Sequence, residues 1–242
     1  MVDVEQMIKE AIILAGGLGT RLQPVLGNTP KPMALINGNP FLHYVFHYLR
    51  FYKVPRVILS VSPMTRSIEE YFGNKYHGIE LIYSYETEPL GTGGGVKLAL
   101  QKCNSDTVLV LNGDTLFSVD LNQLSTFHIK NNAQITLALK YYDEIGRFGK
   151  VNIDHRFRIT GFEEKKGDIS KSGYINGGVY LINLPLFSSI NFPNTFSIEK
   201  DFFEKYLEHI NFLGFVSNKY FIDIGIPEDY LRAQNEFKTY QF

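Results

Sequence analysis

The segment of residues 11–33, AIILAGGLGTRLQPVLGNTPKPM, constrains the chain more than any other. A short apolar run ends abruptly in a glycine loop, Gly16-Gly17-Leu18-Gly19-Thr20-Arg21, and Pro30-Lys31-Pro32 follows. A strand that breaks into such a loop exposes several backbone N–H groups in one concave turn, and turns of this kind bind phosphate. Arg21 and Lys31 add two positive charges beside the turn. The segment therefore predicts a site for a nucleoside triphosphate.

The spacing of this loop excludes the two commoner glycine loops. A Walker loop needs a glycine, four residues and then Gly-Lys-Ser/Thr, and neither Gly16, Gly17 nor Gly19 begins such a pattern. A dinucleotide fingerprint would need a glycine or alanine at Leu22, which is too large for close packing of helix on strand. Neither a P-loop ATPase nor a dehydrogenase is indicated.

The rest of the chain alternates short apolar runs with helical patterns, which predicts an α/β fold. We expect a single Rossmann-like domain with a mixed, mostly parallel sheet flanked by helices. The expected strands are residues 11–14, 57–61, 79–85, 107–111, 135–141, 150–153 and 179–182, and the expected helices are residues 40–52, 93–102 and 227–238. In open α/β sheets ligands bind beyond the carboxyl ends of strands. Gly16, Gly91 and Asp114 each follow such an end, so we expect them to share one cleft.

Composition narrows the class of protein further. The 242 residues have a formal charge of −1, which gives no reason to expect a nucleic acid or an anionic membrane as partner. A single cysteine, Cys103, fits a reducing cytoplasm. The sequence has no apolar run of membrane-spanning length and no secretory signal, so we expect a cytoplasmic location. The six histidines show no metal-ligand spacing and are expected to be structural or solvated.

Two aspartates follow apolar runs and are candidate magnesium ligands. Asp114 ends Leu-Asn-Gly-Asp, and Asp223 lies in Phe-Ile-Asp-Ile-Gly. Mg²⁺ is commonly held by one or two carboxylates together with phosphate oxygens and waters. Taken alone, each aspartate could equally cap a turn.

The motifs as a set resemble the signature of the sugar-1-phosphate nucleotidyltransferases, which make nucleotide-diphosphate sugars from a nucleoside triphosphate and a sugar 1-phosphate. The resemblance rests on LAGGLGTRL with Pro-Lys-Pro-Met, and continues through Asn112-Gly113-Asp114, Phe162-Glu163-Glu164-Lys165, Asn176-Gly177-Gly178 and Asp223-Ile224-Gly225. It implies a nucleotide-binding part at about residues 9–130 and a sugar-phosphate-binding part at about residues 131–230. It also implies Mg²⁺ on Asp114 and Asp223, and a homodimer is possible.

Transfer of a nucleotidyl group needs alignment and charge neutralisation more than a general base. The second pKa of a phosphate monoester is about 6, so the sugar phosphate is already a nucleophilic dianion at neutral pH. We expect Arg21 to hold the leaving phosphates and Lys31 the reacting α-phosphate, and by resemblance Lys165 to hold the sugar phosphate. The expected nucleotide-binding residues are Leu14, Ala15, Gly16, Gly17, Gly19, Thr20, Arg21, Glu86, Pro89, Gly91, Thr92, Asn112 and Gly113. The expected sugar-phosphate-binding residues are Gly149, Glu163, Lys165, Asn176 and Gly177.

Glu86 predicts which nucleobase the site recognises. Thymidylyl and uridylyl members of the family carry a glutamine where alignment on Pro89 and Gly91 places this glutamate. Guanine presents two N–H donors side by side, which one carboxylate can accept, so Glu86 favours GTP. Glu88 is the alternative reader of the base, and Glu86 could also be a plain surface residue.

The later motifs look most like those of family members that act on a heptose 1-phosphate, although a mannose-1-phosphate enzyme would present much the same pocket.

Two alternative functions from other classes are considered. A non-catalytic nucleotide-sugar sensor could lose Asp114, Arg21 or Lys31, but this chain keeps all three. A metal-dependent glycosyltransferase would need an Asp-x-Asp motif, which the Asp114 region lacks.

Overall fold

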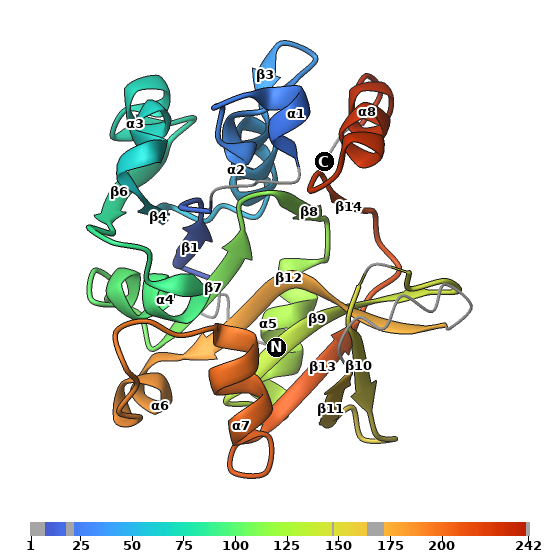
Figure 1. Cartoon of the computed structure of the whole chain (residues 1–242). Coiled ribbons are helices and arrows are strands. Elements are labelled where there is room, and N and C mark those ends of the chain that lie inside the picture. The colour runs from blue at the N-terminus through green and yellow to red at the C-terminus, as the bar shows by residue number, and fades with distance from the viewer. Residues whose placement is uncertain (1–7, 18–21, 147, 164–171, 241–242) are drawn as a thin grey trace.

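A ten-stranded mixed sheet forms the centre of the computed structural model (Figure 1). The structure describes residues 8–17, 22–146, 148–163 and 172–240. Eight strands follow the order β11-β10-β12-β7-β1-β4-β6-β5, while β9 pairs with β12 and with β13. The neighbours β7, β1, β4 and β6 run parallel to one another, and the pairs that involve β12 are antiparallel. The expected α/β fold with a mixed sheet is confirmed.

The elements have the following bounds. The strands are β1 (Glu10–Leu14), β2 (Leu35–Ile36), β3 (Asn39–Pro40), β4 (Arg56–Val61), β5 (Lys75–Tyr76), β6 (Ile79–Tyr85), β7 (Thr107–Asn112), β8 (Thr115–Phe117), β9 (Ile135–Tyr142), β10 (Lys150–Ile153), β11 (Ile159–Glu163), β12 (Gly173–Asn183), β13 (Phe212–Val216) and β14 (Phe221–Asp223). The α-helices are α1 (Gln23–Leu26), α2 (Phe41–Phe51), α3 (Arg66–Phe72), α4 (Gly91–Leu100), α5 (Leu121–Lys130), α6 (Leu184–Ser189), α7 (Glu204–Tyr206) and α8 (Pro227–Glu236). Short 3₁₀ turns cover Lys31–Met33 and Pro63–Thr65, and a π-helix covers Ile198–Phe203.

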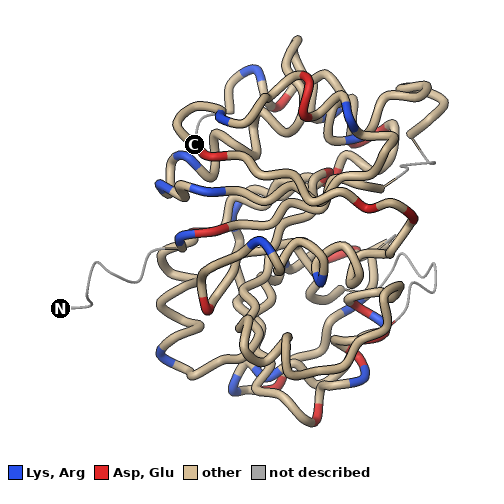
Figure 2. The backbone as a smooth tube through the Cα atoms, turned by 90° about the vertical axis from the view of Figure 1, so that its left-hand side faces the viewer, with Lys and Arg blue, Asp and Glu red and all other residues tan. Residues whose placement is uncertain are grey.

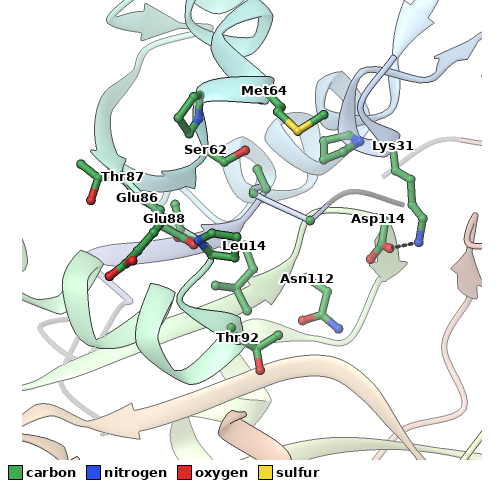
Figure 3. Close-up of a pocket in the computed structure, with 18 residues that line it drawn as sticks. Leu14, Lys31, Ser62, Met64, Glu86, Thr87, Glu88, Thr92, Asn112 and Asp114 are labelled. Atoms are coloured by element: carbon green, nitrogen blue, oxygen red, sulfur yellow. Dashed lines mark hydrogen bonds and ion pairs between the residues drawn. The ribbon is translucent and has the colours of Figure 1, made fainter. Parts of the chain in front are cut away.

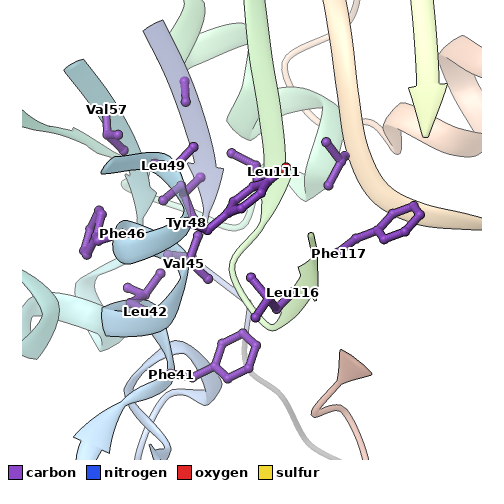
Figure 4. Close-up of a cluster of buried hydrophobic side chains, with 14 of the residues drawn as sticks. Phe41, Leu42, Val45, Phe46, Tyr48, Leu49, Val57, Leu111, Leu116 and Phe117 are labelled. Carbon is purple, nitrogen blue, oxygen red and sulfur yellow. The ribbon is translucent and has the colours of Figure 1, made fainter. Parts of the chain in front are cut away.

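The central strands are buried on both faces, and this is why they read as continuous apolar runs. In β1, Ala11 and Ile13 face one core, whereas Ile12 faces the other. The first core includes residues of α2, α3, α5 and α8, and the second includes residues of α4 and α6. Figure 4 shows the first core, in which Val45, Tyr48 and Leu49 lie on the side of α2 that is toward the strands. Because side chains alternate along a strand, each central strand holds a helical layer on either side.

A small separate ladder sets the position of both candidate acids. Strands β8 and β14 form a two-stranded antiparallel sheet in which Asp223 pairs with Thr115. The Ile224 N–H donates to the Asp114 carbonyl over 3.0 Å, which extends the ladder by one residue. Residues that are more than a hundred positions apart in sequence are therefore neighbours in space.

Charged residues of both signs are interspersed along the described chain (Figure 2). Within the described residues, no helix is long and apolar enough to cross a bilayer.

The sequence-based statement that the six histidines show no metal-ligand spacing is wrong. His43 and His47 are four residues apart on α2, and the structure brings His77 beside them, so that ligand atoms of all three lie within 4.8 Å of one another. The spacing of the first two is a metal-ligand spacing on a helix, because residues i and i+4 share one face. The third histidine, His77, lies in the turn between β5 and β6, and its distance from His47 in the sequence gives no sign that the two are neighbours.

Candidate active site

A cavity of about 590 Å³ opens at the carboxyl ends of the parallel strands. Gly16 follows β1, Gly91 begins α4 after β6, and Asp114 follows β7, and all three line it. The expectation that these residues share a cleft is confirmed. Figure 3 shows Glu86, Thr87 and Glu88 toward one end of the cavity and the pair Lys31–Asp114 toward the other.

The end with Lys31 and Asp114 is electrostatically paired. The Lys31 ammonium donates to the Asp114 carboxylate over 2.8 Å, with side chains 12% and 31% exposed. Lys31 lies in a 3₁₀ turn that begins after Pro30, and Pro32 closes that turn against Gly113. Two prolines thus fix the backbone of the lysine. The Lys31 side chain lines the first cavity, where its ammonium contacts Asp114.

Asp223 lies next to this pair. Its Oδ1 accepts a hydrogen bond of 2.7 Å from the Gly225 N–H. A Cβ added to Gly225 would lie 2.7 Å from that oxygen and 3.5 Å from the Lys31 ammonium, so a glycine is needed here for close approach. The structure therefore places Asp114, Asp223 and Lys31 around one point. Asp114 lines the first cavity and Asp223 a second one.

The other end of the first cavity is built on Glu86, which is 9% exposed. Its Oε1 accepts a 2.9 Å hydrogen bond from the Ser60 hydroxyl, and its Oε2 accepts one of 3.2 Å from the Leu90 N–H. A Cβ on Gly95 would come within 2.8 Å of Oε1, so the glycine at this position of α4 leaves room for the carboxylate. Glu86 is thus not a plain surface residue. A carboxylate has about four lone-pair sites, so two bonds leave acceptor capacity for a ligand.

The second cavity, of about 450 Å³, adjoins the first and is lined by residues from Asn112 to Asp223. Gly149, Glu163 and Asn176, which the family resemblance assigns to the sugar phosphate, all line this cavity. The Asn176 amide donates to Glu199 over 2.7 Å, and the Asn152 amide donates to Glu163 over 2.8 Å. The cavity therefore presents oriented carboxylates and amides, which suit a polyhydroxylated ligand.

Asn112 lines both cavities. The hydroxyl of Tyr180, a fully buried residue, donates to its Oδ1 over 2.7 Å. Its Nδ2 faces Gly178, whose φ is +69° and where a Cβ would come within 2.7 Å of that nitrogen. The side chain of Asn112 is held from two sides at the boundary between the cavities.

The predicted site residues divide into three groups. Most line one of the two cavities: Leu14, Ala15, Gly16, Gly17, Lys31, Glu86, Pro89, Gly91, Thr92, Asn112, Asp114, Gly149, Glu163, Asn176 and Asp223. Gly19, Thr20, Arg21 and Lys165 lie outside the described residues. Gly113 and Gly177 are not among the lining residues of either cavity.

Gly113 and Gly177 are glycines because neighbouring elements pack closely against them. A Cβ on Gly113 would lie 2.7 Å from the Leu14 carbonyl, and one on Gly177 would lie 2.2 Å from the Phe117 ring. These glycines let neighbouring elements approach the site closely, which is a different requirement from touching a ligand.

Sequence reasoning missed three residues that line or support the site, Ser60, Glu199 and Lys200. Ser60 is interior to β4, and nothing in a strand pattern marks a hydroxyl that orients a carboxylate. Glu199 and Lys200 line the second cavity from a π-helix, an element that is rare and concentrated at functional sites. Their motif, Phe196-Ser197-Ile198-Glu199-Lys200-Asp201, is one of the later motifs that support the resemblance, but it did not mark these two side chains as cavity residues.

Comparisons with known proteins agree with this geometry. The sequence profile of the nucleotidyl transferase family matches residues 10–239. D-glycero-alpha-D-manno-heptose 1-phosphate guanylyltransferase of Aneurinibacillus thermoaerophilus is 49% identical, over 96% of this chain and 99% of that protein. The protein of the same name from Campylobacter jejuni is 43% identical, over 91% and 96%.

A solved structure of HddC from Yersinia pseudotuberculosis complexed with GMP-PN superimposes with a TM-score of 0.83 and 35% sequence identity. The match covers 95% of this chain and 100% of that one. The resemblance drawn from the sequence motifs is thereby confirmed. Because the profile spans nearly the whole chain and these relatives align almost end to end, the chain belongs to the nucleotidyl transferase family.

Proposed function

We propose that this enzyme transfers GMP from GTP to D-glycero-α-D-manno-heptose 1-phosphate, releasing pyrophosphate. The single observation that carries the proposal is the pair of adjoining cavities joined at Asn112, with a buried carboxylate at one end and a lysine–aspartate pair at the junction. The relatives that align over their full length carry the heptose guanylyltransferase name, which supports the same substrates.

The chemistry is an in-line displacement at the α-phosphorus. A phosphate oxygen of the sugar 1-phosphate attacks, the bond from the α-phosphorus to the bridging oxygen of the β-phosphate breaks, and the electron pair leaves with pyrophosphate. The attacking dianion needs no general base at neutral pH. The contribution of this chain is orientation and positive charge. In our proposal Lys31 neutralises the α-phosphate, while Arg21 and Lys165 hold the leaving and incoming phosphates.

The donor set at the junction suits Mg²⁺. Two carboxylates of adjacent chain segments, Asp114 and Asp223, are the oxygen ligands that this hard cation prefers, and phosphate oxygens and waters would complete its shell. When bound, Mg²⁺ would add positive charge beside the α-phosphate and help to align the reacting groups. Lys31 now neutralises Asp114 over 2.8 Å, so this lysine is positioned to transfer its contact to the nucleotide.

Recognition of guanine is assigned to Glu86. Ser60 and the Leu90 N–H hold both carboxylate oxygens, so the side chain is oriented before a ligand arrives. Guanine N1–H and N2–H form a two-donor edge that fits such an acceptor. Glu88 also lines the cavity and is the second candidate.

The product, GDP-heptose, would supply bacterial surface polysaccharide such as capsule, S-layer glycan or lipopolysaccharide. We propose that the reaction takes place in the cytoplasm. The lone Cys103 is consistent with a reducing compartment, since the chain cannot form an internal disulfide. A homodimer and the absence of a nucleic-acid partner stay predictions.

The test is pyrophosphate release with each of GTP, ATP, UTP and dTTP, paired with heptose 1-phosphate, mannose 1-phosphate or glucose 1-phosphate. We expect turnover with GTP and heptose 1-phosphate. Turnover with GTP and mannose 1-phosphate alone would replace the sugar, and turnover with another nucleotide would overturn the role of Glu86. No turnover in folded protein would favour a nucleotide-sugar sensor.

The metal assignment is tested by Asp114→Asn and Asp223→Asn. Each substitution keeps the size of the side chain but removes the charge, so turnover should fall by orders of magnitude while the thermal unfolding midpoint changes little. EDTA should abolish turnover and added Mg²⁺ should restore it. Full activity of either variant would contradict the assignment.

A further inference from the structure

Three histidines gather where α2 meets the β5–β6 turn, and none of them lines either cavity of the candidate active site. Their ligand nitrogens lie within 4.8 Å of one another. The ring centroids are 4.3 Å apart for His43 and His47, 4.8 Å for His47 and His77, and 5.8 Å for His43 and His77. Half of the histidines in the chain are therefore at one place.

Two elements fix this arrangement. His43 and His47 lie one helical turn apart on α2, so their rings stand one above the other on one face. His77 and Gly78 form the two-residue turn between β5 and β6, with φ values of +48° and +91°. Turns with two positive φ values favour Asn-Gly, so the conformation itself does not call for a histidine at this position. The hairpin thus places the exposed His77 ring beside the two rings on the helix.

The histidines are partly prepared as ligands. The Tyr76 hydroxyl is hydrogen-bonded to Nδ1 of His43 over 2.8 Å, which fixes the ring and leaves Nε2 as its other nitrogen. Ligating imidazoles in proteins usually make such a bond with their second nitrogen.

We propose that His43, His47 and His77 bind a divalent transition-metal ion, with Zn²⁺ as the best fit. Zinc–nitrogen bonds of about 2.0–2.1 Å require tetrahedral ligand atoms roughly 3.3 Å apart. The described nitrogens must therefore close by an ångström or so, and His77 is exposed and can move toward the helix. Three imidazoles select against Mg²⁺, which prefers oxygen ligands, so this site is chemically distinct from the one proposed at Asp114.

The site leaves a fourth coordination position open and links two separate elements. The Tyr76–His43 hydrogen bond already joins the β5–β6 hairpin to α2, and a bound ion would add a further link between them and stabilise the native state. Arg50 opposes binding. Its guanidinium contacts Nδ1 of His77 over 3.5 Å, and its charge would repel a cation.

The experiment uses the full chain without an affinity tag, freed of metal by chelation. Zn²⁺ is titrated calorimetrically, Co²⁺ by its visible absorption, and the unfolding midpoint is measured with and without each ion. We expect one ion per chain, a tetrahedral Co²⁺ spectrum with nitrogen ligands, and a midpoint raised by several degrees with Zn²⁺ but not with Mg²⁺.

His77→Asn is the decisive variant, because asparagine suits the left-handed turn position and removes the imidazole. Its midpoint without metal should match the parent protein, while Zn²⁺ affinity falls by more than about tenfold, as even outer-shell changes cost 10–100-fold. Arg50→Gln should strengthen Zn²⁺ binding by removing the opposing charge. His155→Ala, an exposed histidine elsewhere, is the matched control and should change nothing.

Several results would overturn the proposal. Binding that survives His77→Asn, or that His155→Ala weakens equally, would assign it to scattered surface groups. No binding by the parent protein at micromolar Zn²⁺ would refute the site directly. None of these outcomes bears on nucleotidyl transfer, because pyrophosphate release with Mg²⁺ is measured separately.

Discussion

Glu86 shows how a single residue can be fixed before its ligand arrives. In Glu86→Gln the amide keeps one acceptor oxygen but turns an N–H group toward the guanine donors. A hydrogen bond to a charged group contributes about 1.5–3 kcal/mol, so kcat/KM for GTP should fall roughly 10- to 150-fold. The same assay should show a relative gain for UTP, whose edge an amide matches.

Glu88→Gln is the control for this substitution, because Glu88 lines the same cavity. It should leave the GTP preference unchanged. If instead Glu88→Gln reduces GTP use and Glu86→Gln does not, base recognition belongs to Glu88 and Glu86 only supports the loop.

His128 predicts a pH dependence of stability. It is 4% exposed, is hydrogen-bonded to the Thr136 hydroxyl over 2.8 Å, and burial lowers its pKa to about 4. The unfolded chain, with a pKa of about 6.5, binds the proton more readily. Neutral His128 therefore contributes to the free energy of unfolding above about pH 6.5. This contribution, on the order of 3 kcal/mol in all, is lost as the pH falls toward 4.

His128→Asn keeps a polar atom near the position of Nδ1 but does not titrate in this range. Denaturant unfolding of both proteins at several pH values between about 4 and 7 checks the prediction. The variant should lose less stability on acidification than the parent, and parallel curves would contradict the assignment.

At the scale of elements, α4 begins with glycines although glycine disfavours helices. The segment before the π-helix crosses this first turn, and the Phe196 carbonyl accepts from the Gly93 N–H over 2.9 Å. A Cβ on Gly94 would lie 2.3 Å from the Asn194 carbonyl oxygen. Close approach of two backbones, rather than helix propensity, decides the residue here.

Gly94→Ala should therefore destabilise the protein. Helix propensity would gain up to about 1 kcal/mol, but overpacking costs typically 1–3 kcal/mol and here meets backbone that cannot rotate away. We expect a net loss of about 2 kcal/mol in the free energy of unfolding by denaturant. Gly161→Ala is the control, because its new Cβ meets only the Asn152 amide at 3.9 Å, and its loss should stay within about 0.5 kcal/mol. Equal stability of the two variants would refute the packing argument.

Elements with strong apolar periodicity could be predicted from the sequence, and those shaped by the site could not. The bounds of β6 and β10 agree with the prediction residue for residue. β12 runs over Gly173–Asn183, whereas only residues 179–182 were expected as strand. Its first half carries Asn176, Gly177 and Gly178, whose polarity and left-handed glycine interrupt the ladder to β9 and do not read as a strand.

Prediction of the site is limited in the same way, because sequence patterns do not show which side chains contact one another in the folded protein. Lys31, Asp114 and Glu86 are found because motifs or alignment mark them, and the structure brings them to one cavity. Tyr180 reads as one more buried residue of a strand, since only the folded geometry shows its hydroxyl on Asn112. Second contacts of this kind depend on which strands become neighbours.

At the scale of the whole molecule, Tyr180 and Asn112 join the two cavities. Tyr180→Phe removes the hydroxyl that orients Asn112, so KM should rise for both substrates by about tenfold, with a stability loss of about 1 kcal/mol. Tyr48→Phe is the matched control, since that buried tyrosine donates to the Val119 carbonyl over 2.7 Å. It should cost similar stability and leave both KM values unchanged. A rise in only one KM would show that Asn112 serves one cavity.

The pairing of β8 with β14 affects how the chain behaves while it is being synthesised. Asp114 is added to the growing chain before half of the 242 residues have been made, and Asp223 follows more than a hundred residues later. Until β14 arrives, the apolar side chains of Leu116 and Phe117, buried in the finished fold, lack their partner strand. Chains in synthesis expose such surfaces to chaperones and to one another. Over the same interval the nascent protein therefore lacks Asp223 at the candidate active site and exposes Leu116 and Phe117. Docking of β14 onto β8 corrects both at once.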